Sequence, residues 1–214
     1  MLLCGMIRYI LFDLDNTLYP ASAGMEEEMM ARIAAYSATY LGVSTDEALR
    51  LRREQIADYG TTLEWLMAEH GLTAIEEYYA FVHPDGEEDR LIPDPQLRDF
   101  IKALPVPASI LTNAPMEHAE RVLRKLELEG LFQHIFDIRS NGLKGKPNEI
   151  AFRNALKVIG YKPAEVLFVD DLPPYVEGFL RLGGNGVLVD HGAIYPSSTI
   201  PRVRTVMEIG RFLN

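Results

Sequence analysis

The chain has 214 residues, of which 48% are hydrophobic and 24% are charged, and its formal net charge is −10. This composition is typical of a globular protein with a sizeable core and excludes a largely disordered chain. The negative charge argues against a nucleic-acid polymer as partner, because such proteins need clustered Lys and Arg to displace the counterions of the phosphates. An acidic protein can still bind a small anion where a cation and a basic side chain lie at the site.

The cysteine content and the start of the chain indicate its compartment. Cys4 is the only cysteine, so no intramolecular disulfide can form, and we expect Cys4 to act as a small apolar residue. The apolar start has no basic segment before it and is followed by Arg8, which is not the pattern of a signal peptide. No apolar run approaches the roughly 18 residues of a membrane span. We therefore expect a cytoplasmic protein without a membrane partner.

The first apolar run, residues 9–12, predicts a strand, and the long segment after it predicts helices only. Helical patterns cover residues 21–41, 45–57, 63–69 and 74–82, and they are interrupted at Gly42, Gly60 and Gly71. The segment is too long for a plain crossover, and the stretch from Pro93 to Pro95 marks its end. We therefore predict a helical cap at residues 19–92, inserted into a core made of residues 1–18 and 93–214.

Beyond this segment, apolar runs and helical patterns alternate. The runs cover residues 109–112, 135–138, 166–169 and 186–189; one helix opens at Pro115 with Ala119, Val122, Leu123 and Leu126 as its apolar stripe, and another runs from Pro147 to Gly160. No helical pattern separates the last two runs. Such continuous hydrophobicity is typical of parallel strands with helices on both faces. The order predicts an α/β fold with a Rossmann-like, doubly wound parallel sheet.

Polar residues follow the apolar runs at the positions where ligands bind in such folds, the carboxyl ends of the strands. They are Asp13 and Asp15 after the first run, Thr112 and Asn113 after the second, Lys144 and Lys146 in a loop that opens a helix, and Asp170 and Asp171 after the fourth run. Because these strand ends share one edge of the sheet, we expect a single site.

This set of side chains supplies each part of a phosphoryl transfer. One carboxylate can attack phosphorus to give an acyl-phosphate, and a second can protonate the leaving alkoxide and later deprotonate water. Four acidic groups would repel a dianionic substrate, and a hard divalent ion such as Mg²⁺ removes that conflict, because it prefers oxygen ligands. Thr112, nearby backbone N–H groups and Lys146 can hold the phosphoryl oxygens.

The same residues resemble the haloacid dehalogenase (HAD) superfamily. Asp13-x-Asp15-x-Thr17, Thr112-Asn113, Lys146-Pro147 and Asp170-Asp171 occur in the order and at the spacing of its four motifs. The stretches 12–20, 59–63 and 66–71 look like its pyrimidine 5′-nucleotidase branch. The resemblance covers essentially the whole chain. It implies a Rossmann-like core with a helical cap after the first motif, and a hydrolase of phosphate monoesters.

The resemblance also implies a role for each matching residue. It makes Asp13 the nucleophile and Asp15 the acid/base, gives phosphate binding to Thr112, Asn113 and Lys146, and gives metal binding to Asp13, Asp170, Asp171 and the backbone carbonyl of Asp15. Lys144 is the alternative to Lys146, which is the better match because it precedes Pro147. The chain departs from the pattern after Asp171, where relatives often have Ser followed by a polar or acidic residue and this chain reads Leu-Pro-Pro-Tyr.

Selection of the leaving group is expected from the cap. The candidates are Tyr19 at the hinge, and Tyr59 and Thr62 in a glycine-containing turn; the alternative for this turn is a purely structural role in ending and capping helices. The histidines show no metal-ligand spacing. His118 follows Thr112 closely on a helix and is expected on the surface of that helix, with a contact to the site as the alternative.

Together, these features predict a Mg²⁺-dependent phosphatase that acts on a small phosphorylated metabolite through an aspartyl-phosphate on Asp13. The resemblance favours a nucleoside 5′-monophosphate as substrate. A sugar-phosphate or phosphoglycolate phosphatase is the alternative enzyme, and a catalytically silent relative that binds a phosphorylated ligand is the alternative outside enzymes. A dehalogenase is disfavoured, because that branch needs neither a second acid at Asp15 nor a metal. The chain could be a monomer or a homodimer.

Overall fold

The computed structural model describes residues 6–56 and 58–213. The expected role of Cys4, and Ala57 as the end of a predicted helix, lie outside these residues. No helix in the described ranges combines the length and the apolar character that a membrane crossing requires.

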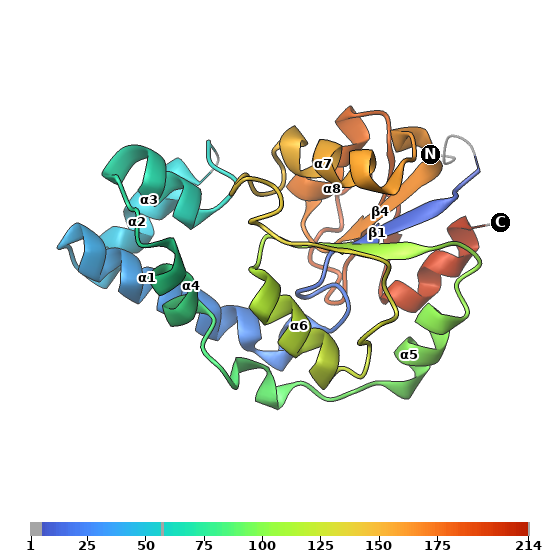
Figure 1. The fold of residues 1–214 in the computed structure, drawn as a ribbon, viewed down its shortest axis with the longest axis horizontal. Coiled ribbons are helices and arrows are strands. Elements are labelled where there is room, and N and C mark those ends of the chain that lie inside the picture. Colours follow the sequence, from blue (N-terminus) through green and yellow to red (C-terminus); the bar gives the residue numbers. More distant parts are fainter. Residues whose placement is uncertain (1–5, 57, 214) are drawn as a thin grey trace.

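The described residues form a six-stranded sheet in the order β3-β2-β1-β4-β5-β6, and every pair of neighbouring strands is parallel. The strands are β1 (Tyr9–Phe12), β2 (Ala108–Leu111), β3 (Ile135–Phe136), β4 (Val166–Asp170), β5 (Asn185–Val189) and β6 (Arg202–Val203). The connections that carry helices cover both faces of this sheet (Figure 1). The prediction of a Rossmann-like, doubly wound parallel sheet is confirmed.

The two faces of the sheet are covered by different helices. The helices of the core are α5 (Pro95–Lys102), α6 (Met116–Lys125), α7 (Glu149–Ile159) and α8 (Pro173–Arg181), with the 3₁₀ turns η3 (Pro163–Glu165) and η4 (Val206–Phe212). A further 3₁₀ turn, η2 (Glu87–Arg90), lies between α4 and α5 in the chain. Ile10 and Phe12 of β1 pack in one apolar cluster with α5, α6 and η4. Tyr9 and Leu11 pack in another with α7 and α8. This alternation follows from the period of two along a strand and explains why β1 is apolar throughout.

Helices α1 to α4 follow β1 and stand apart from the sheet (Figure 1). They span Met25–Leu41, Thr45–Gln55, Thr62–His70 and Ile75–Val82. Ser44 and Thr61 begin α2 and α3, because each side chain accepts a hydrogen bond from a backbone N–H three residues further on. Gly42 and Gly71 end α1 and α3 in the left-handed conformation that glycine adopts at low cost. We refer to these four helices as the cap.

The cap has an apolar core of its own. Leu63, Trp65 and Leu66 of α3 pack with Tyr36 of α1 and Tyr78 of α4 in a cluster separate from those of the sheet. At the seam with the core, a Cβ atom at Gly60 would lie 2.5 Å from the carbonyl oxygen of Gly145. The cap turn therefore touches the loop before Lys146, and only glycine permits this approach.

Several predicted elements differ from the observed ones. Gly24, with a φ of +78°, separates the 3₁₀ turn η1 (Ala21–Ala23) from α1, so the helix predicted over residues 21–41 begins at Met25. Two helices and one strand in the described ranges were not predicted, namely α5, α8 and the short edge strand β6, and the 3₁₀ turns η2, η3 and η4 were not predicted either.

The prediction that no helix separates the last two predicted strands is wrong, because α8 lies between β4 and β5. Pro173 and Pro174, which break helices in their interior, instead occupy the first turn of α8, where a missing N–H costs nothing. Gly178 lies inside α8 because a Cβ atom there would lie 3.1 Å from Phe152 of α7, which packs against it. Two residue types that normally argue against a helix therefore serve its start and its packing.

Candidate active site

Lys146 connects two carboxylates at the carboxyl ends of β1 and β4. Its Nζ atom lies 2.6 Å from Asp13 Oδ1 and 2.7 Å from Asp170 Oδ2, and its exposed fraction is 0%. A buried ammonium group needs such partners to offset its lost hydration. Lys144 instead extends to the cap, where its Nζ atom lies 2.5 Å from Glu64 Oε1 of α3. Of the two lysines, only Lys146 reaches the predicted nucleophile.

The site can hold a hard cation. One carboxylate oxygen each of Asp13, Asp170 and Asp171 lie within 4.8 Å of one another. Burial, together with the charges of Asp170 and Asp15, raises the pKa of Asp13 to about 7 despite the opposing effect of Lys146. Burial and the charges of Asp170 and Asp13 raise the pKa of Asp171 to about 9. The crowding of negative charge and the all-oxygen donor set fit Mg²⁺.

The three carboxylates differ in how free their oxygens are. Asp170 Oδ2 accepts from Lys146, and its Oδ1 accepts a 2.8 Å hydrogen bond from the backbone N–H of Leu172. Asp171 has no hydrogen bond or ion pair to another described residue. Among the described contacts, both carboxylate oxygens of Asp170 are therefore engaged by the protein, whereas those of Asp171 are free to bind a cation.

Of the residues around the expected phosphate position, some line the cavity and others hold neighbouring residues in place. Thr112 is buried and lines the cavity, and its Oγ1 accepts a 3.0 Å hydrogen bond from the N–H of Ala114. Thr17 donates a 3.0 Å hydrogen bond to Asp13 Oδ2. The side-chain amide of Asn113 donates to the backbone oxygen of Lys146 and accepts from its N–H. Asn113 therefore holds the backbone of the lysine.

Asp15 is held by two donors on one oxygen. Tyr19 OH donates over 2.6 Å and His118 Nε2 over 2.8 Å, both to Asp15 Oδ1. Burial alone would raise the pKa of Asp15, but the charge of His118 and these hydrogen bonds outweigh it and lower the pKa. Oδ2 of Asp15 has no hydrogen-bond partner within the described ranges.

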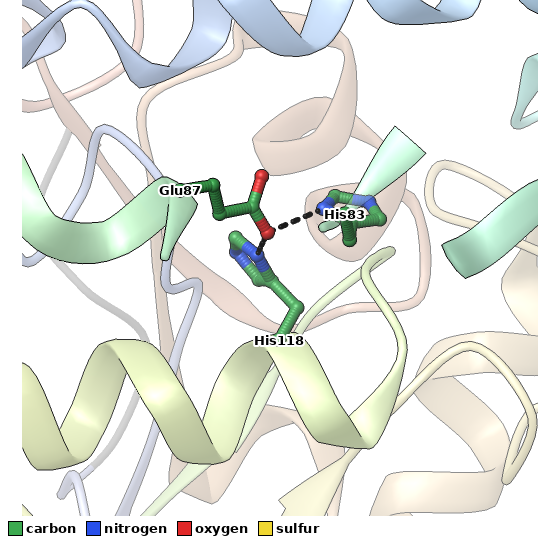
Figure 2. Close-up of side chains that lie close together, drawn as sticks. All are labelled: His83, Glu87 and His118. Atoms are coloured by element: carbon green, nitrogen blue, oxygen red, sulfur yellow. Dashed lines mark hydrogen bonds and ion pairs between the residues drawn. The ribbon is translucent and has the colours of Figure 1, made fainter. Parts of the chain in front are cut away.

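The expectation that His118 lies on the surface is wrong. Its exposed fraction is 2%, and its Nδ1 atom lies 2.5 Å from Glu87 Oε1 (Figure 2). Its Nε2 atom contacts Asp15. Burial alone would lower the pKa of His118, but the two carboxylates raise it to about 10. The sequence did carry a signal: His118 is four residues before Val122, on the apolar stripe of α6.

A cavity of about 210 Å³ lies between the core and the cap. Asp13, Asp15, Thr112, Asn113, Lys146 and Asp171 line its core side. The cap side is mostly apolar, with Met29 and Ile33 of α1, Tyr78 of α4 and the charged Arg52 of α2. The structure thus places the catalytic, metal-binding and phosphate-binding candidates around one cavity.

The proposed selecting residues occupy different places. Tyr19 and Thr62 line the cavity, but Tyr19 OH binds Asp15 and Thr62 Oγ1 accepts a 2.7 Å hydrogen bond from Arg52 Nε. Tyr59 does not line it, and its hydroxyl donates to Glu69 within the cap. Arg52 was not among the candidates, since an arginine within the helix over 45–57 gives no sequence signal of its position.

This geometry agrees with comparisons to known proteins. The model of the haloacid dehalogenase-like hydrolase family matches residues 7–183. The chain belongs to this family, which confirms the superfamily resemblance.

Among curated relatives, a yeast protein named phosphate metabolism protein 8 (Saccharomyces cerevisiae) is 26% identical over 195 residues. The alignment covers 85% of this chain but only 61% of the yeast protein. A protein named glyceraldehyde 3-phosphate phosphatase from Methanopyrus kandleri is 26% identical, with 97% of this chain and 99% of the relative covered.

Among solved structures, a HAD phosphatase from Thermococcus onnurineus gives a TM-score of 0.67 at 18% identity, with 97% of this chain and 98% of the other covered. The magnesium-bound HAD-hydrolase YfnB from Bacillus subtilis gives 0.63 at 20% identity and covers 98% and 100%. An L-2-haloacid dehalogenase from Xanthobacter autotrophicus gives 0.61 at 18% identity, with 98% and 100% covered. At these identities the similarity shows a shared fold.

Proposed function

We propose that the chain is a Mg²⁺-dependent phosphatase that hydrolyses a small phosphate monoester through an aspartyl-phosphate on Asp13. The observation that carries the proposal is the buried contact of Asp13 with Lys146 at the cavity, which Asp171 also lines, with the carboxylate of Asp170 buried beside them. Once it is ionised, a carboxylate fixed by two donors is a preorganised nucleophile, and a buried cation next to it can stabilise charge that develops on phosphoryl oxygens.

In the first step, a carboxylate oxygen of Asp13 forms a bond to phosphorus, and the bond from phosphorus to the leaving oxygen breaks. Asp15 passes a proton to that oxygen; in the resting arrangement this proton lies on His118, 2.8 Å from Asp15 Oδ1. In the second step, Asp15 takes a proton from water, whose oxygen attacks phosphorus. Phosphate leaves, and Asp13 is restored.

Asp13, Asp171 and Asp170, with the backbone carbonyl of Asp15, would hold the Mg²⁺, which supplies positive charge against the carboxylates and the phosphoryl oxygens when bound. Lys146 and Thr112 hold phosphoryl oxygens from the other side of the cavity. Asn113 supports this arrangement through the backbone of Lys146.

The proposed substrate is a nucleoside 5′-monophosphate, and the support for it is the similarity of the first motif and the cap turn to the pyrimidine 5′-nucleotidase branch. A sugar phosphate is the second candidate, favoured by the name of the Methanopyrus kandleri relative. A catalytically silent ligand-binding protein is less well supported, because the nucleophile, the acid/base and the lysine are all present around one cavity. We propose a cytoplasmic location from the cysteine content.

The decisive experiment is a panel of phosphate monoesters assayed with Mg²⁺. It compares uridine and cytidine 5′-monophosphates with purine nucleotides, sugar phosphates and phosphoglycolate. Faster turnover of the pyrimidine nucleotides supports the nucleotidase. A preference for sugar phosphates moves the assignment to the second candidate, and no turnover of any monoester contradicts the phosphatase itself.

A further inference from the structure

Arg52 is an arginine of the cap that combines partial burial with the lack of a carboxylate partner. Arg50, two residues earlier on the exposed side of α2, has carboxylate partners in Glu47 and Glu54, and Arg53 is exposed. Arg52 has no carboxylate within 4.0 Å in the described ranges, although it is half-buried. The side chain of Arg52 makes one hydrogen bond to the described residues, from Nε to Thr62 Oγ1, and its two terminal nitrogens have no hydrogen-bond partner among them.

The surroundings of Arg52 make an unused guanidinium costly. Burial lowers the pKa of Arg52, and the opposing effects of Tyr78, Tyr175 and Glu26 do not offset it. Arg52 lines the same cavity as Asp13, on the opposite, cap side. A planar guanidinium with free N–H groups is suited to bind carbonyl or carboxylate oxygens.

We propose that Arg52 binds the leaving group of the substrate, and that this leaving group carries a carbonyl or carboxylate oxygen. The inference rests on the proposed phosphatase function and adds the substrate class to it. Thr62, which holds Nε, positions the guanidinium, so its role in selection is indirect.

The test compares kcat/KM, with Mg²⁺, for three substrates. Uridine 5′-monophosphate offers carbonyl oxygens, phosphoglycolate offers a carboxylate, and phenyl phosphate offers neither. Arg52→Ala is compared with Arg52→Lys, which keeps the charge without the fork. Arg53→Ala is the matched control, because Arg53 is the exposed neighbour and does not line the cavity.

Arg52→Ala is expected to lower kcat/KM for uridine monophosphate or phosphoglycolate by roughly ten- to a hundredfold relative to phenyl phosphate, as for a lost charged hydrogen bond. The substrate that is affected identifies the acceptor. Arg53→Ala should leave the ratios unchanged, and Thr62→Val should shift them in the same direction by less. If Arg52→Ala does not fold, the change in the kcat/KM ratios caused by Thr62→Val tests the proposal instead.

Equal losses on all three substrates would overturn the inference. The inference about Arg52 also fails if the wild-type chain hydrolyses phenyl phosphate as efficiently as both other substrates. The proposed phosphatase function would stand in that case. Absence of turnover of every monoester is the result that removes the proposed function together with the inference.

A separate observation concerns Glu87, which is surrounded by basic side chains from three helices. Its Oε1 accepts from His118 of α6 at 2.5 Å and from His83 at the end of α4 at 3.1 Å (Figure 2). The same oxygen accepts from Arg121 of α6 at 3.2 Å. Its Oε2 lies 2.8 Å from Arg32 Nη2 of α1. These partners lower the pKa of Glu87 far below its usual range, despite its burial.

His83, Glu87 and His118 are residue types that also bind metal ions, and their ligand atoms lie within 4.8 Å of one another. A divalent ion there would lie next to the guanidinium groups of Arg32 and Arg121, which contact the same carboxylate. This repulsion, together with the engagement of His118 Nε2 by Asp15, argues for a charge network without a metal.

The geometry points to His118 and Glu87 as positioning residues for Asp15. Glu87 fixes the His118 ring from one side, and the ring fixes Asp15 Oδ1 from the other, which leaves Oδ2 for the reacting oxygen. The inference rests on the proposed acid/base role of Asp15. It predicts that damage to the network harms the proton transfer to the leaving group more than the attack by Asp13.

Leaving groups of different basicity separate these two effects. p-Nitrophenyl phosphate releases a weakly basic phenolate that needs little protonation, whereas glycerol phosphate releases a strongly basic alkoxide. The value of kcat/KM reports the steps up to this departure. The variants are Asp15→Asn as reference, His118→Leu, His118→Gln, Glu87→Gln, and Glu120→Gln as an exposed carboxylate-to-amide control on α6.

His118→Leu is expected to lose roughly ten- to a hundredfold more on glycerol phosphate than on p-nitrophenyl phosphate, in the direction of Asp15→Asn. His118→Gln should recover part of the difference, since its amide can still donate to Asp15. Glu87→Gln should also lose more kcat/KM on glycerol phosphate than on p-nitrophenyl phosphate, but the difference should be smaller. Glu120→Gln should show no difference between the two substrates.

Equal losses on both substrates, in folded His118 variants, would overturn the positioning role. This result leaves the proposed function intact when Asp15→Asn alone depends on the leaving group. No dependence in Asp15→Asn contradicts the acid/base assignment, and the positioning role falls with it.

Discussion

The core side and the cap side of the cavity treat charge in opposite ways. On the core side, Lys146 is fully buried but lies between Asp13 and Asp170, and Asp15 is paired with His118. On the cap side, Arg52 has no carboxylate partner in the described ranges. On the side that would react with the phosphoryl group, the charged groups other than Asp171 have partners within the protein, whereas on the side facing the leaving group the charge of Arg52 has no carboxylate partner among the described residues.

This difference has a structural origin. The core residues come from the ends of paired parallel strands, whose positions are fixed by backbone hydrogen bonds. The cap residues come from helices that pack on an apolar cluster of their own. A strand edge suits chemistry that must be the same for every monoester, and a separately packed helical layer can vary its contacts to the leaving group.

The largest effect is expected at Asp13. Asp13→Asn keeps the shape but replaces the nucleophilic carboxylate with a weakly nucleophilic amide, so kcat should fall by more than about a thousandfold on every substrate. Circular dichroism should show an unchanged fold. Activity above a few per cent of wild type in a folded, non-deamidated variant would rule out Asp13 as the nucleophile.

Removal of the metal should, like Asp13→Asn, lower activity on every substrate. Activity is expected to disappear in chelator and to return with Mg²⁺, because crowded carboxylates otherwise repel the substrate. Asp171→Ala should raise the Mg²⁺ concentration needed for half-maximal activity, or abolish activity, because Asp171 has the freest oxygens. Chelator-resistant turnover would contradict the metal site.

The two lysines offer a matched pair across the seam. Lys146→Ala removes the buried cation between Asp13 and Asp170 and should lower kcat/KM by roughly a hundredfold or more. Lys144→Ala removes an ion pair to the buried Glu64 in which the Lys144 side chain is 45% exposed and which does not involve Asp13, so the expected change in kcat/KM is no more than about threefold. Comparable losses in both variants would mean that the cap contact matters as much as the phosphoryl site.

The smallest effect is a pH dependence of Mg²⁺ affinity. The pKa values of about 7 for Asp13 and about 9 for Asp171 lie above the usual range, so both carboxyls retain protons near neutral pH. Mg²⁺ requires ionised ligands, so its affinity should rise with pH between 6 and 9, by up to about tenfold per unit for each displaced proton. Calorimetry in buffers of different ionisation enthalpy measures the protons released when Mg²⁺ binds. A Mg²⁺ affinity that does not change with pH would contradict the raised pKa values of Asp13 and Asp171.

Residues that are local in the sequence were predicted well. The apolar run of β1 and the carboxylates after it, and the alternation of β and α that makes the sheet parallel, depend on short-range patterns. Gly160 ends α7 in the left-handed conformation, as its position after an apolar stripe predicts. In contrast, α8 was missed because its prolines and Gly178 have meaning only through their place in the helix and against α7.

The sequence by itself determined the class of fold and the set of chemical groups, because strand periodicity and four ordered motifs leave little freedom in either. Only the tertiary structure decided which of Lys144 and Lys146 meets Asp13, that His118 faces Asp15, and that Arg52 faces the cavity. These facts depend on how the cap lies on the core. That arrangement is set by contacts between residues far apart in the chain, such as Gly60 with Gly145, for which a sequence pattern carries no distance.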